Sequence, residues 1–387
     1  MISKKSNMKK LFIEKFGVIP SYTVTSPGRF ELLGNHTDHN GGLCLASACN
    51  LTINGFLSKR DDLKVAIKSV GYSDLNIDLI DLSINESEKF TSEALVRGVA
   101  SYFRNKGYQI GGFNLVIESK IFKGAGVSSS AAYEVMIAQI FNVLFNEGKV
   151  SKIELAKAGQ YAENIYFGKK SGLLDQSAIA FGNISFMDFK DGDNPIVNSI
   201  SFPFNDVDVV IVNTGGSHAD LSDLYSNIPL KMKSAAKKSG AEKLIESSKD
   251  KVLNNGNLDA DEKDFSTHFY DENERVKKMV IALSKNDKKE FYKLIKESCE
   301  SSTKYLRNMQ VGDNYQSSPR RACDIVNKVV GDKGACKING GGFAGSIVCF
   351  VDKDISDLLI EKMSVEYGSN NVKKISIYNN STLVEKI

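Results

Sequence analysis

The segment from residue 111 to residue 149, GGFNLVIESKIFKGAGVSSSAAYEVMIAQIFNVLFNEGK, joins a strand pattern directly to a helix pattern. Apolar side chains alternate with others over 111–121, which is typical of a half-buried strand. From Ser129 the apolar residues recur at helical spacing, and Gly148 ends the run. Strand and helix patterns are interleaved along the rest of the chain without a regular βαβ period, which predicts an α+β fold with two lobes.

The loop between that strand and that helix carries the chemistry of the segment. Gly124 and Gly126 allow the backbone to approach a ligand closely. Ser128, Ser129 and Ser130 place hydroxyl and N–H groups at the start of the helix, where free N–H groups and the helix dipole attract anions. A phosphate is therefore the expected ligand, although the loop lacks the G-x-x-x-x-G-K-[ST] pattern of a Walker A motif. Taken alone, the pattern also fits a plain capped turn.

The remaining elements are predicted from periodicity and from capping residues. A short amphipathic helix is expected at the N-terminus, and the polar stretch 247–265 is expected to be a long surface excursion. Ser151 and Glu154 have the pattern of a capping box, which begins a helix that ends at Gly168. The other predicted elements are a strand at 206–216, helices at 267–284 and 287–306, a strand at 346–351, a helix at 354–367 and a strand at 372–378.

Length, charge and cysteine content restrict the class of protein. The 387 residues suffice for two domains, which we place at 1–200 and 201–387 because the stretch 191–206 is rich in polar and turn-forming residues. A net charge of +3 and the lack of a long apolar run give no reason to expect a nucleic-acid or membrane partner. The N-terminus lacks the apolar core of a secretory signal. Six cysteines without a C-x-x-C pair are expected to be reduced core thiols, which favours the cytoplasm.

A second dense motif, SPGRFELLGNHTDHNGG, covers residues 26–42. Arg29 follows a Pro-Gly turn, and His36 and Asp38 alternate as side chains on one edge of an extended segment do. His36, Asp38 and His39 have the ligand types of a metal site, but the hydroxyl groups of a sugar need the same donors and acceptors. A polar turn without function is a third interpretation, so the motif alone leaves its ligand open.

A third motif, KINGGGFAGSIVCFV, covers residues 337–351. Its consecutive glycines, which include Gly341 and Gly342, predict a tight turn with exposed backbone N–H groups just before a β-branched strand. Exposed N–H groups suit an anion, but an ordinary hairpin turn explains this pattern equally well.

In this order and with these flanks, the three motifs resemble those of the GHMP kinase superfamily. GAGVSSSA at 124–131 resembles its phosphate loop, G-x-G-[LV]-S-S-S-A, and GGGFAG at 340–345 resembles its C-terminal glycine motif. GRFELLGNHTDHNGG at 28–42 is similar to the galactokinase signature, whose usual form is GR-x-N-L-I-G-E-H-x-D-Y-N. The resemblance covers nearly the whole chain. It implies a two-lobed α+β fold, with an N-terminal lobe like ribosomal protein S5 and a ferredoxin-like C-terminal lobe.

The resemblance implies an enzyme that moves the γ-phosphoryl group of ATP to the anomeric hydroxyl of galactose. The family's catalytic aspartate lies in a G-x-x-D-Q pattern, matched here by GLLDQ at 172–176, so Asp175 would accept or orient the proton of the sugar hydroxyl. Arg29 matches the arginine that pairs with this aspartate, and would keep it ionised and stabilise charge on the phosphoryl group. Glu163 and Ser130 match the family's Mg²⁺ ligands, and two protein ligands suffice because Mg²⁺ keeps several waters.

The resemblance also implies how the substrates bind. The phosphates of ATP would lie on the loop and the glycine motif described above, and the expected partners are a small-molecule sugar and ATP bound by a monomer. The positions that match the family's sugar-binding residues are Asn35, His36, Asp38, Gly172 and Tyr225.

The chain departs from the family at three positions, where Asn35 replaces an acid, His39 a tyrosine and Phe122 a proline. Phe122 is interpreted as a packing change. Asn35 matters more, because the family's acid faces the C6 end of galactose and its loss would relieve repulsion against a C6 carboxylate. Galacturonate is therefore a second candidate substrate. A non-catalytic sugar sensor and a mevalonate or homoserine kinase are further alternatives, which the intact phosphate loop and the H-x-D signature disfavour.

Overall fold

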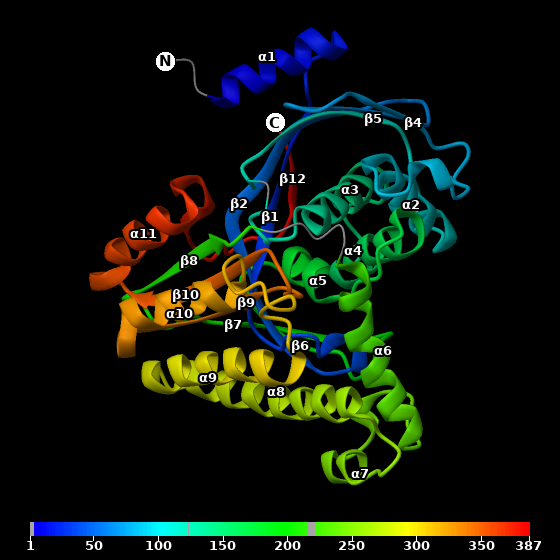
Figure 1. The fold of residues 1–387 in the computed structure, drawn as a ribbon. Coiled ribbons are helices and arrows are strands. Elements are labelled where there is room, and N and C mark those ends of the chain that lie inside the picture. Colours follow the sequence, from blue (N-terminus) through cyan, green and yellow to red (C-terminus); the bar gives the residue numbers. More distant parts are fainter. Residues whose placement is uncertain (1–3, 123, 216–220) are drawn as a thin grey trace.

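The computed structural model describes residues 4–122, 124–215 and 221–387, whose fold is drawn in Figure 1. Two β-sheets form its framework. The strand order of the larger sheet is β12-β1-β2-β5-β3-β4, with β6 paired to β2 and β7 paired to β6, and that of the smaller sheet is β11-β8-β10-β9. The strands are β1 (Tyr22–Leu33), β2 (Leu43–Lys59), β3 (Lys64–Ser69), β4 (Leu75–Asp78), β5 (Phe113–Ser119), β6 (Ile184–Asp188), β7 (Ile196–Ile200), β8 (Val207–Asn213), β9 (Gly334–Asn339), β10 (Ser346–Asp352), β11 (Val372–Ile375) and β12 (Leu383–Lys386).

Helices cover these sheets, so the predicted mixture of helices and strands is confirmed (Figure 1). The α-helices are α1 (Lys4–Phe16), α2 (Ser92–Asn105), α3 (Ser129–Phe145), α4 (Lys152–Tyr161), α5 (Leu174–Phe181), α6 (Ser222–Lys238), α7 (Lys249–Leu253), α8 (Ala260–Ser284), α9 (Lys288–Ser301), α10 (Pro319–Val330) and α11 (Lys353–Tyr367).

The antiparallel strands β1 and β2 take part in two hydrophobic cores. Near one end, Val24 and Leu57 pack in a core with α2, α3, α4 and α5. Near the other end, Phe30 and Leu45 pack in a second core with β8, β10, α8 and α9. Because both cores bury the same pair of strands, the second motif of the sequence is held at the junction between them.

The smaller sheet buries both of its faces. Along β8, Val209 and Ile211 belong to the core shared with α8 and α9, whereas Val210 and Val212 pack in a third core with α10 and α11. This alternation is the period of two that a strand imposes on its side chains. The prediction of a strand at 206–216 is confirmed for Val207–Asn213, and residue 216 lies outside the described residues.

The last strand of the chain belongs to the first sheet. Residues Tyr22 to Thr25 of β1 pair with β12 in antiparallel register, so the red strand lies beside the blue one in Figure 1. Strand β7 ends at Ile200 and β8 begins at Val207, on either side of the predicted boundary between residues 200 and 201. The division into lobes at 1–200 and 201–387 stays a prediction. Strand β12 belongs to the second segment by sequence, but it pairs with β1 of the first segment.

Several local predictions are confirmed. The helix after the glycine and serine loop is α3, and the hydroxyl of Ser151 caps α4 by accepting the Glu154 N–H at 3.3 Å. The N-terminal helix α1 is present and buries Phe12 completely. Helix α4 passes into a π-helix at Ala162–Phe167, which Gly168 ends with a left-handed φ of 91°. Isolated π-helical turns are often found at functional sites.

The prediction for 247–265 is wrong, because this stretch contains α7 and the first turns of α8. Helix α8 begins at Ala260 because Asp259 and Glu262 form a complete capping box there. Val252 and Phe265 are buried in a core with α6, so a few apolar residues suffice to anchor the segment. The low apolar content of the stretch predicted no helix, although the capping-box residues Asp259 and Glu262 are present in its sequence.

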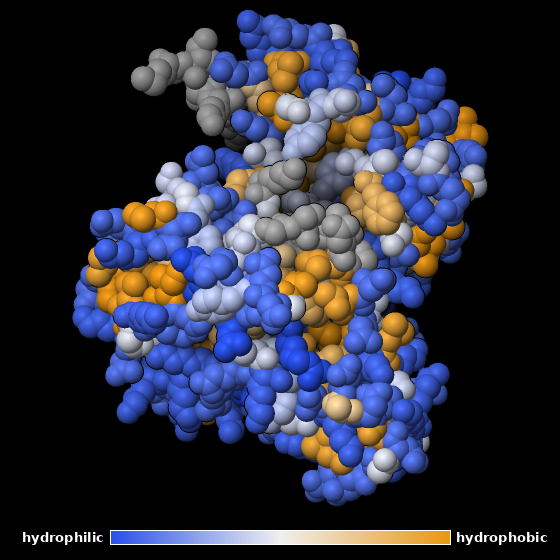
Figure 2. Space-filling view, viewed as in Figure 1, coloured by the Kyte–Doolittle hydropathy of each residue, from blue (hydrophilic) through white to orange (hydrophobic). Residues whose placement is uncertain are grey.

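The surface and the cysteines agree with the class of protein expected from composition. In the described residues, no helix is both long and apolar enough to cross a membrane. Figure 2 shows that hydrophilic residues cover most of one face of the molecule, with hydrophobic residues gathered in smaller patches. All six cysteines are buried and free, so the prediction of unpaired core thiols is confirmed.

The second core predicts one stability experiment. Phe350 is fully buried and its ring contacts Phe30 of β1 and Phe291 of α9, with centroid distances of 6.1 Å and 5.2 Å. Phe350→Ala should lower the free energy of unfolding in urea by about 3–5 kcal/mol, because it removes apolar contacts and leaves a cavity. Val365→Ala, at a side chain that is 80% exposed, should change it by less than about 0.5 kcal/mol. Equal effects of the two substitutions would contradict this role of Phe350.

Candidate active site

An ion pair between Arg29 and Asp175 lies at the centre of the three sequence motifs. The guanidinium of Arg29 donates from Nε to Oδ1 of Asp175 at 2.6 Å and from Nη2 to Oδ2 at 2.9 Å. Its third donor, Nη1, reaches the carbonyl oxygen of Gly126 in the phosphate-loop motif at 2.6 Å. Asn339, just before the glycine motif, donates to the same carbonyl at 2.9 Å. The three motifs therefore meet at Gly126.

Asp175 is ionised at neutral pH. It is the second residue of α5, and its Oδ2 also accepts a hydrogen bond from the hydroxyl of Ser128. Burial raises the pKa of Asp175, but Arg29 and Ser128 outweigh burial and hold the pKa below its usual value of 3.8. A carboxylate with a lowered pKa is a weak base, so it is better suited to orienting a hydroxyl group than to removing its proton early.

The N-terminus of α3 is open to an anion. Ser128 occupies the N-cap position with a φ of 57°, but its side chain makes no capping hydrogen bond because its hydroxyl is bound to Asp175. The first-turn N–H groups of α3 lack partners within the helix and carry the positive end of its dipole. Gly126 is required beside them, since an added Cβ would lie 1.9 Å from the Ser346 hydroxyl. This geometry fits the predicted phosphate loop.

Glu163 and Ser130 are positioned to share a divalent cation. The hydroxyl of Ser130 donates to Oε1 of Glu163 at 3.2 Å. Two neighbouring ligands of an octahedral Mg²⁺, each about 2.1 Å from the ion, lie about 3 Å apart, so these two oxygens fit one ion. Glu163 lies in the π-helix and is only 2% exposed, and it faces the start of α3.

Three polar residues around Glu163 were missed in the sequence. Lys169 donates to Oε1 of Glu163 at 2.9 Å, and Gln176 donates to Oε2 at 3.1 Å. Gln176 also donates to Oε2 of Glu134 at 3.0 Å. Glu134 is completely buried, and burial together with the charge of Glu163 raises its pKa well above 4.5. The lysine pair before GLLDQ and the acid after the serine run were the only signals for Lys169 and Glu134.

The second motif ends in a turn that faces α5 and the glycine motif. Oδ2 of Asp38 accepts the N–H of Leu174 at 3.3 Å, and a Cβ on Gly172 would lie 1.7 Å from this oxygen. His36, with a φ of 58°, contacts the carbonyl oxygen of Gly341 through Nε2 at 2.8 Å. Burial lowers the pKa of His36 to about 4, so the ring is neutral and Nε2 is the donor. Two expected sugar-binding residues, Asp38 and Gly172, thus lie together.

Tyr225 is brought to the same place from α6. Its hydroxyl donates to the carbonyl oxygen of Gly342 at 2.9 Å, and its ring centroid lies 6.4 Å from that of His36. An added Cβ on Gly341 would lie 1.9 Å from the Tyr225 ring, which explains the glycine at that position. The predicted glycine residues therefore lie against the expected sugar-binding residues and against Arg29. Among the described residues, no group of three or more His, Cys, Asp or Glu side chains is placed so that it could hold a metal ion.

Asn35 is buried, and both polar atoms of its side chain already have protein partners. Its amide donates to the carbonyl of Gly340 at 2.8 Å and to Oε2 of Glu31 at 3.3 Å, and its Oδ1 accepts from Asn308 at 2.9 Å. Glu31 in turn accepts at 2.7 Å from Lys337, whose side chain is completely buried. In the usual signature given above, an asparagine matches Glu31 and an acid matches Asn35. The amide and the carboxylate have exchanged places, and the charge of the carboxylate is balanced by Lys337.

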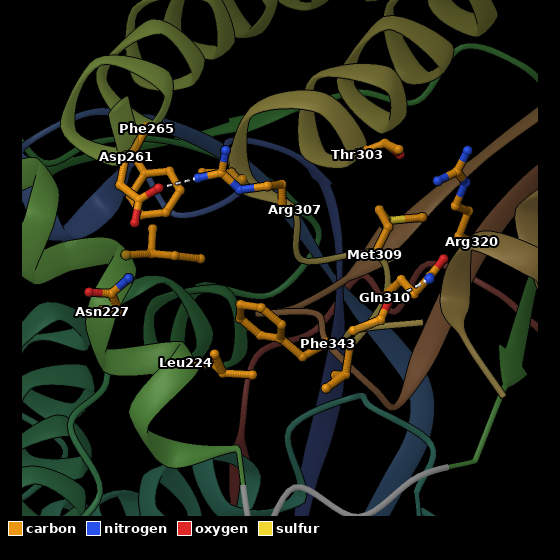
Figure 3. A pocket seen from close by; sticks show the side chains of 14 residues that line it. Leu224, Asn227, Asp261, Phe265, Thr303, Arg307, Met309, Gln310, Arg320 and Phe343 are labelled. Atoms are coloured by element: carbon orange, nitrogen blue, oxygen red, sulfur yellow. Dashed lines mark hydrogen bonds and ion pairs between the residues drawn. The ribbon is translucent and has the colours of Figure 1, made fainter. Parts of the chain in front are cut away.

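A separate cavity of about 450 Å³ lies between α6, α8 and the loop that follows α9 (Figure 3). Arg307 crosses part of it to bind Asp261 at 2.6 Å. Phe343 of the glycine motif lines the cavity, and its ring contacts that of Tyr225 with a centroid distance of 5.5 Å. None of the predicted site residues lines this cavity, so it is a neighbour of the candidate site and not part of it.

Comparison with known proteins identifies the family. Residues 94–183 match the family model of the GHMP kinases N terminal domain, and residues 10–59 match that of the galactokinase galactose-binding signature. A curated galactokinase from Clostridium tetani is 32% identical in an alignment that covers 95% of each chain. The chain belongs to the galactokinase family. It is therefore a kinase of the GHMP superfamily, as the motifs indicated.

Solved structures show the same fold. The crystal structure of Lactococcus lactis galactokinase complexed with galactose matches with a TM-score of 0.86 at 24% identity, over 98% of this chain and all of that one. Methanococcus jannaschii mevalonate kinase matches with a TM-score of 0.66 at 16% identity, over 93% of this chain and 99% of that one. These likenesses confirm the predicted α+β GHMP kinase fold. The galactose-binding signature at 10–59 assigns the chain to the galactokinase branch and not to the mevalonate kinases.

The neutral His36 predicts a pH dependence of stability. Unfolded His36 takes up a proton below a pKa of 6.5, whereas folded His36 does so only near 4, so its contribution to stability is complete above pH 6.5 and is lost as the pH falls towards 4. His36→Asn keeps a residue that tolerates the positive φ and removes this titration. Between pH 7 and pH 4, the wild type should lose up to about 3 kcal/mol more stability than the variant. Urea unfolding at a series of pH values measures this, and parallel curves would contradict the prediction.

Proposed function

We propose that this kinase transfers the γ-phosphoryl group of ATP to the anomeric hydroxyl of galactose. The observation that carries the proposal is the contact of Asp175 with both Arg29 and Ser128, which joins the acceptor side of the site to the phosphate loop. The similarity to a curated galactokinase over 95% of the chain supports galactose as the acceptor. The intact contacts around Asp175 favour a catalyst over a sugar sensor.

The positions of these groups support a part for each of them in the proposed reaction. The amides at the start of α3 would hold the phosphates, and Arg29 would stabilise the charge that develops on the transferred group. Asp175 would orient the sugar hydroxyl in line with the phosphorus and take its proton as the bond to phosphorus forms. Phosphoryl transfer depends mainly on positioning and charge neutralisation, so a weakly basic aspartate is sufficient.

Glu163 and Ser130 are the residues that would hold Mg²⁺. An ion held by these two residues would neutralise part of the charge of the ATP phosphates. The separation of 3.2 Å between the two oxygens supports this assignment, and the hydrogen bond from Gln176 fixes the orientation of the Glu163 carboxylate.

The sugar would bind between the second motif and α5. Asp38 would accept hydrogen bonds from ring hydroxyls, the neutral His36 and Tyr225 would lie beside the glycine motif, and the Gly172 backbone would line the pocket. Lys337 is already paired with Glu31, so a C6 carboxylate at this end of the pocket would lack this cation as a partner, which disfavours galacturonate. The six free thiols support a cytoplasmic location, and the expected monomer stays a prediction.

One prediction concerns Asp175. Asp175→Asn removes the charge that Arg29 binds and the oxygen that takes the proton, so kcat for galactose should fall by about 10²–10⁴-fold in a coupled assay of ADP release. The matched control is Asp191→Asn, in an exposed turn where the carboxylate accepts backbone N–H groups. This control should retain the wild-type rate. Undiminished turnover by Asp175→Asn would show that the catalytic assignment is wrong.

A second prediction concerns the choice of sugar. ATP turnover with galactose should exceed that with galacturonate by about 100-fold or more, because Lys337 is already paired with Glu31 and leaves a desolvated C6 carboxylate without this cation as a partner. Glu31→Gln frees Lys337 to pair with a C6 carboxylate and should narrow this difference, whereas the double variant Glu31→Gln/Lys337→Met, which removes both charges, should not. Wild-type enzyme that phosphorylates galacturonate as fast as galactose would exclude this account of specificity.

A further inference from the structure

Lys169 binds the same carboxylate oxygen that a divalent cation would use. Its ammonium group lies 2.9 Å from Oε1 of Glu163, the oxygen that also accepts the Ser130 hydroxyl. The Glu163 side chain is only 3% exposed, whereas that of Lys169 is 57% exposed, so the lysine reaches into the site from its rim. Lys169 follows Gly168, which ends the π-helix, and its own N–H is held by the Glu163 carbonyl at 3.1 Å.

The position of this ammonium group has a chemical consequence. A cation bound to Glu163 and Ser130 would lie close to the ammonium group of Lys169, and two cations at one oxygen repel each other. This repulsion favours a shift of Lys169, and its long, largely exposed side chain allows one. Helix α3, whose first residues would hold the phosphates, begins at Ser129, and the hydroxyl of Ser130 donates to the same oxygen of Glu163 that Lys169 contacts. A lysine is an effective point charge for phosphate binding.

We propose that Lys169 is a phosphate-binding residue that neutralises Glu163 in the empty enzyme and shifts to an ATP phosphate oxygen when the metal binds. The proposal rests on the proposed function, because it assumes that Glu163 and Ser130 hold the metal. Lys169 would then be a second positively charged side chain on the phosphates of ATP, in addition to Arg29. The same lysine would act in both the empty and the loaded enzyme. In the empty state the lysine prevents an unpaired buried carboxylate, and in the loaded state it contacts the nucleotide.

The neighbouring lysine provides a matched control. Lys170 is also exposed and carries the same charge, but the structure gives it no contact with Glu163 among the described residues. Lys169→Met and Lys170→Met therefore change the net charge equally and differ only in whether Glu163 loses its partner. Lys169→Arg restores the charge at the first position. Thermal unfolding of each variant checks that it is folded.

Two binding measurements test the proposal. The first is the affinity of each variant for a non-hydrolysable ATP analogue with saturating Mg²⁺, measured by isothermal titration calorimetry. The second is the affinity for Mn²⁺ alone, measured by electron paramagnetic resonance. For Lys169→Met we expect analogue binding about tenfold weaker or more, because a charged hydrogen bond is lost, and tighter Mn²⁺ binding, because a competing cation is gone. Lys170→Met should change neither, and Lys169→Arg should restore most of the analogue affinity.

Whether Lys169→Met weakens or strengthens binding of the ATP analogue decides the proposal. If Lys169 only filled the place of the metal, Lys169→Met would leave the analogue affinity unchanged or raise it, and the proposal would be overturned. A loss of affinity as large in Lys170→Met would also overturn it. A separate measurement tests whether Glu163 holds the metal at all. If it does not, Glu163→Gln will leave the Mn²⁺ affinity at the wild-type value.

Discussion

The bidentate ion pair between Arg29 and Asp175 is the contact around which the rest of the site is arranged. It joins β1 to α5 across 146 positions of sequence, and the third donor of the arginine fixes the phosphate loop at Gly126. Arg29 is buried and Asp175 is partly exposed, so removing the aspartate would leave the buried guanidinium without its carboxylate, which is destabilising. The pair thus has two effects in this kinase. It holds the loop at Gly126 next to Asp175, and it keeps that aspartate ionised.

The parts of the site that the sequence predicts are those whose chemistry is local. The loop at 124–130 and the helix after it follow from glycines, serines and helical periodicity within one short segment, and α3 begins where that pattern does. The partner of Glu31 could not be found in this way. Lys337 is 306 positions away and is one of 50 lysines and arginines, and nothing near it in sequence marks it as the buried one. The polar composition of 247–265 led to a wrong prediction of a surface excursion, because α8 begins inside this stretch.

Asn35 shows how a single position can be misinterpreted without its neighbours. Taken alone, it suggested a pocket that had lost a negative charge and could admit an acidic sugar. The structure brings Glu31 to its amide and Lys337 to Glu31, so the unit that determines the electrostatics is a buried trio and not one side chain. Substitutions at either acidic or amide position therefore act on the trio as a whole, and their effects should not add.

Strand β12 also has a consequence for the order in which the chain is made. The ribosome completes β1 early, but the strand that pairs with its outer edge comprises residues 383–386. Until these residues emerge, β1 presents an unsatisfied strand edge of the kind that chaperones protect and that other chains can pair with. A nascent chain interrupted before residue 383 keeps that edge open, although its phosphate loop, Asp175 and glycine motif have all been synthesised. A chain that lacks β12 thus differs from one that has it at a sheet edge and not at the candidate active site.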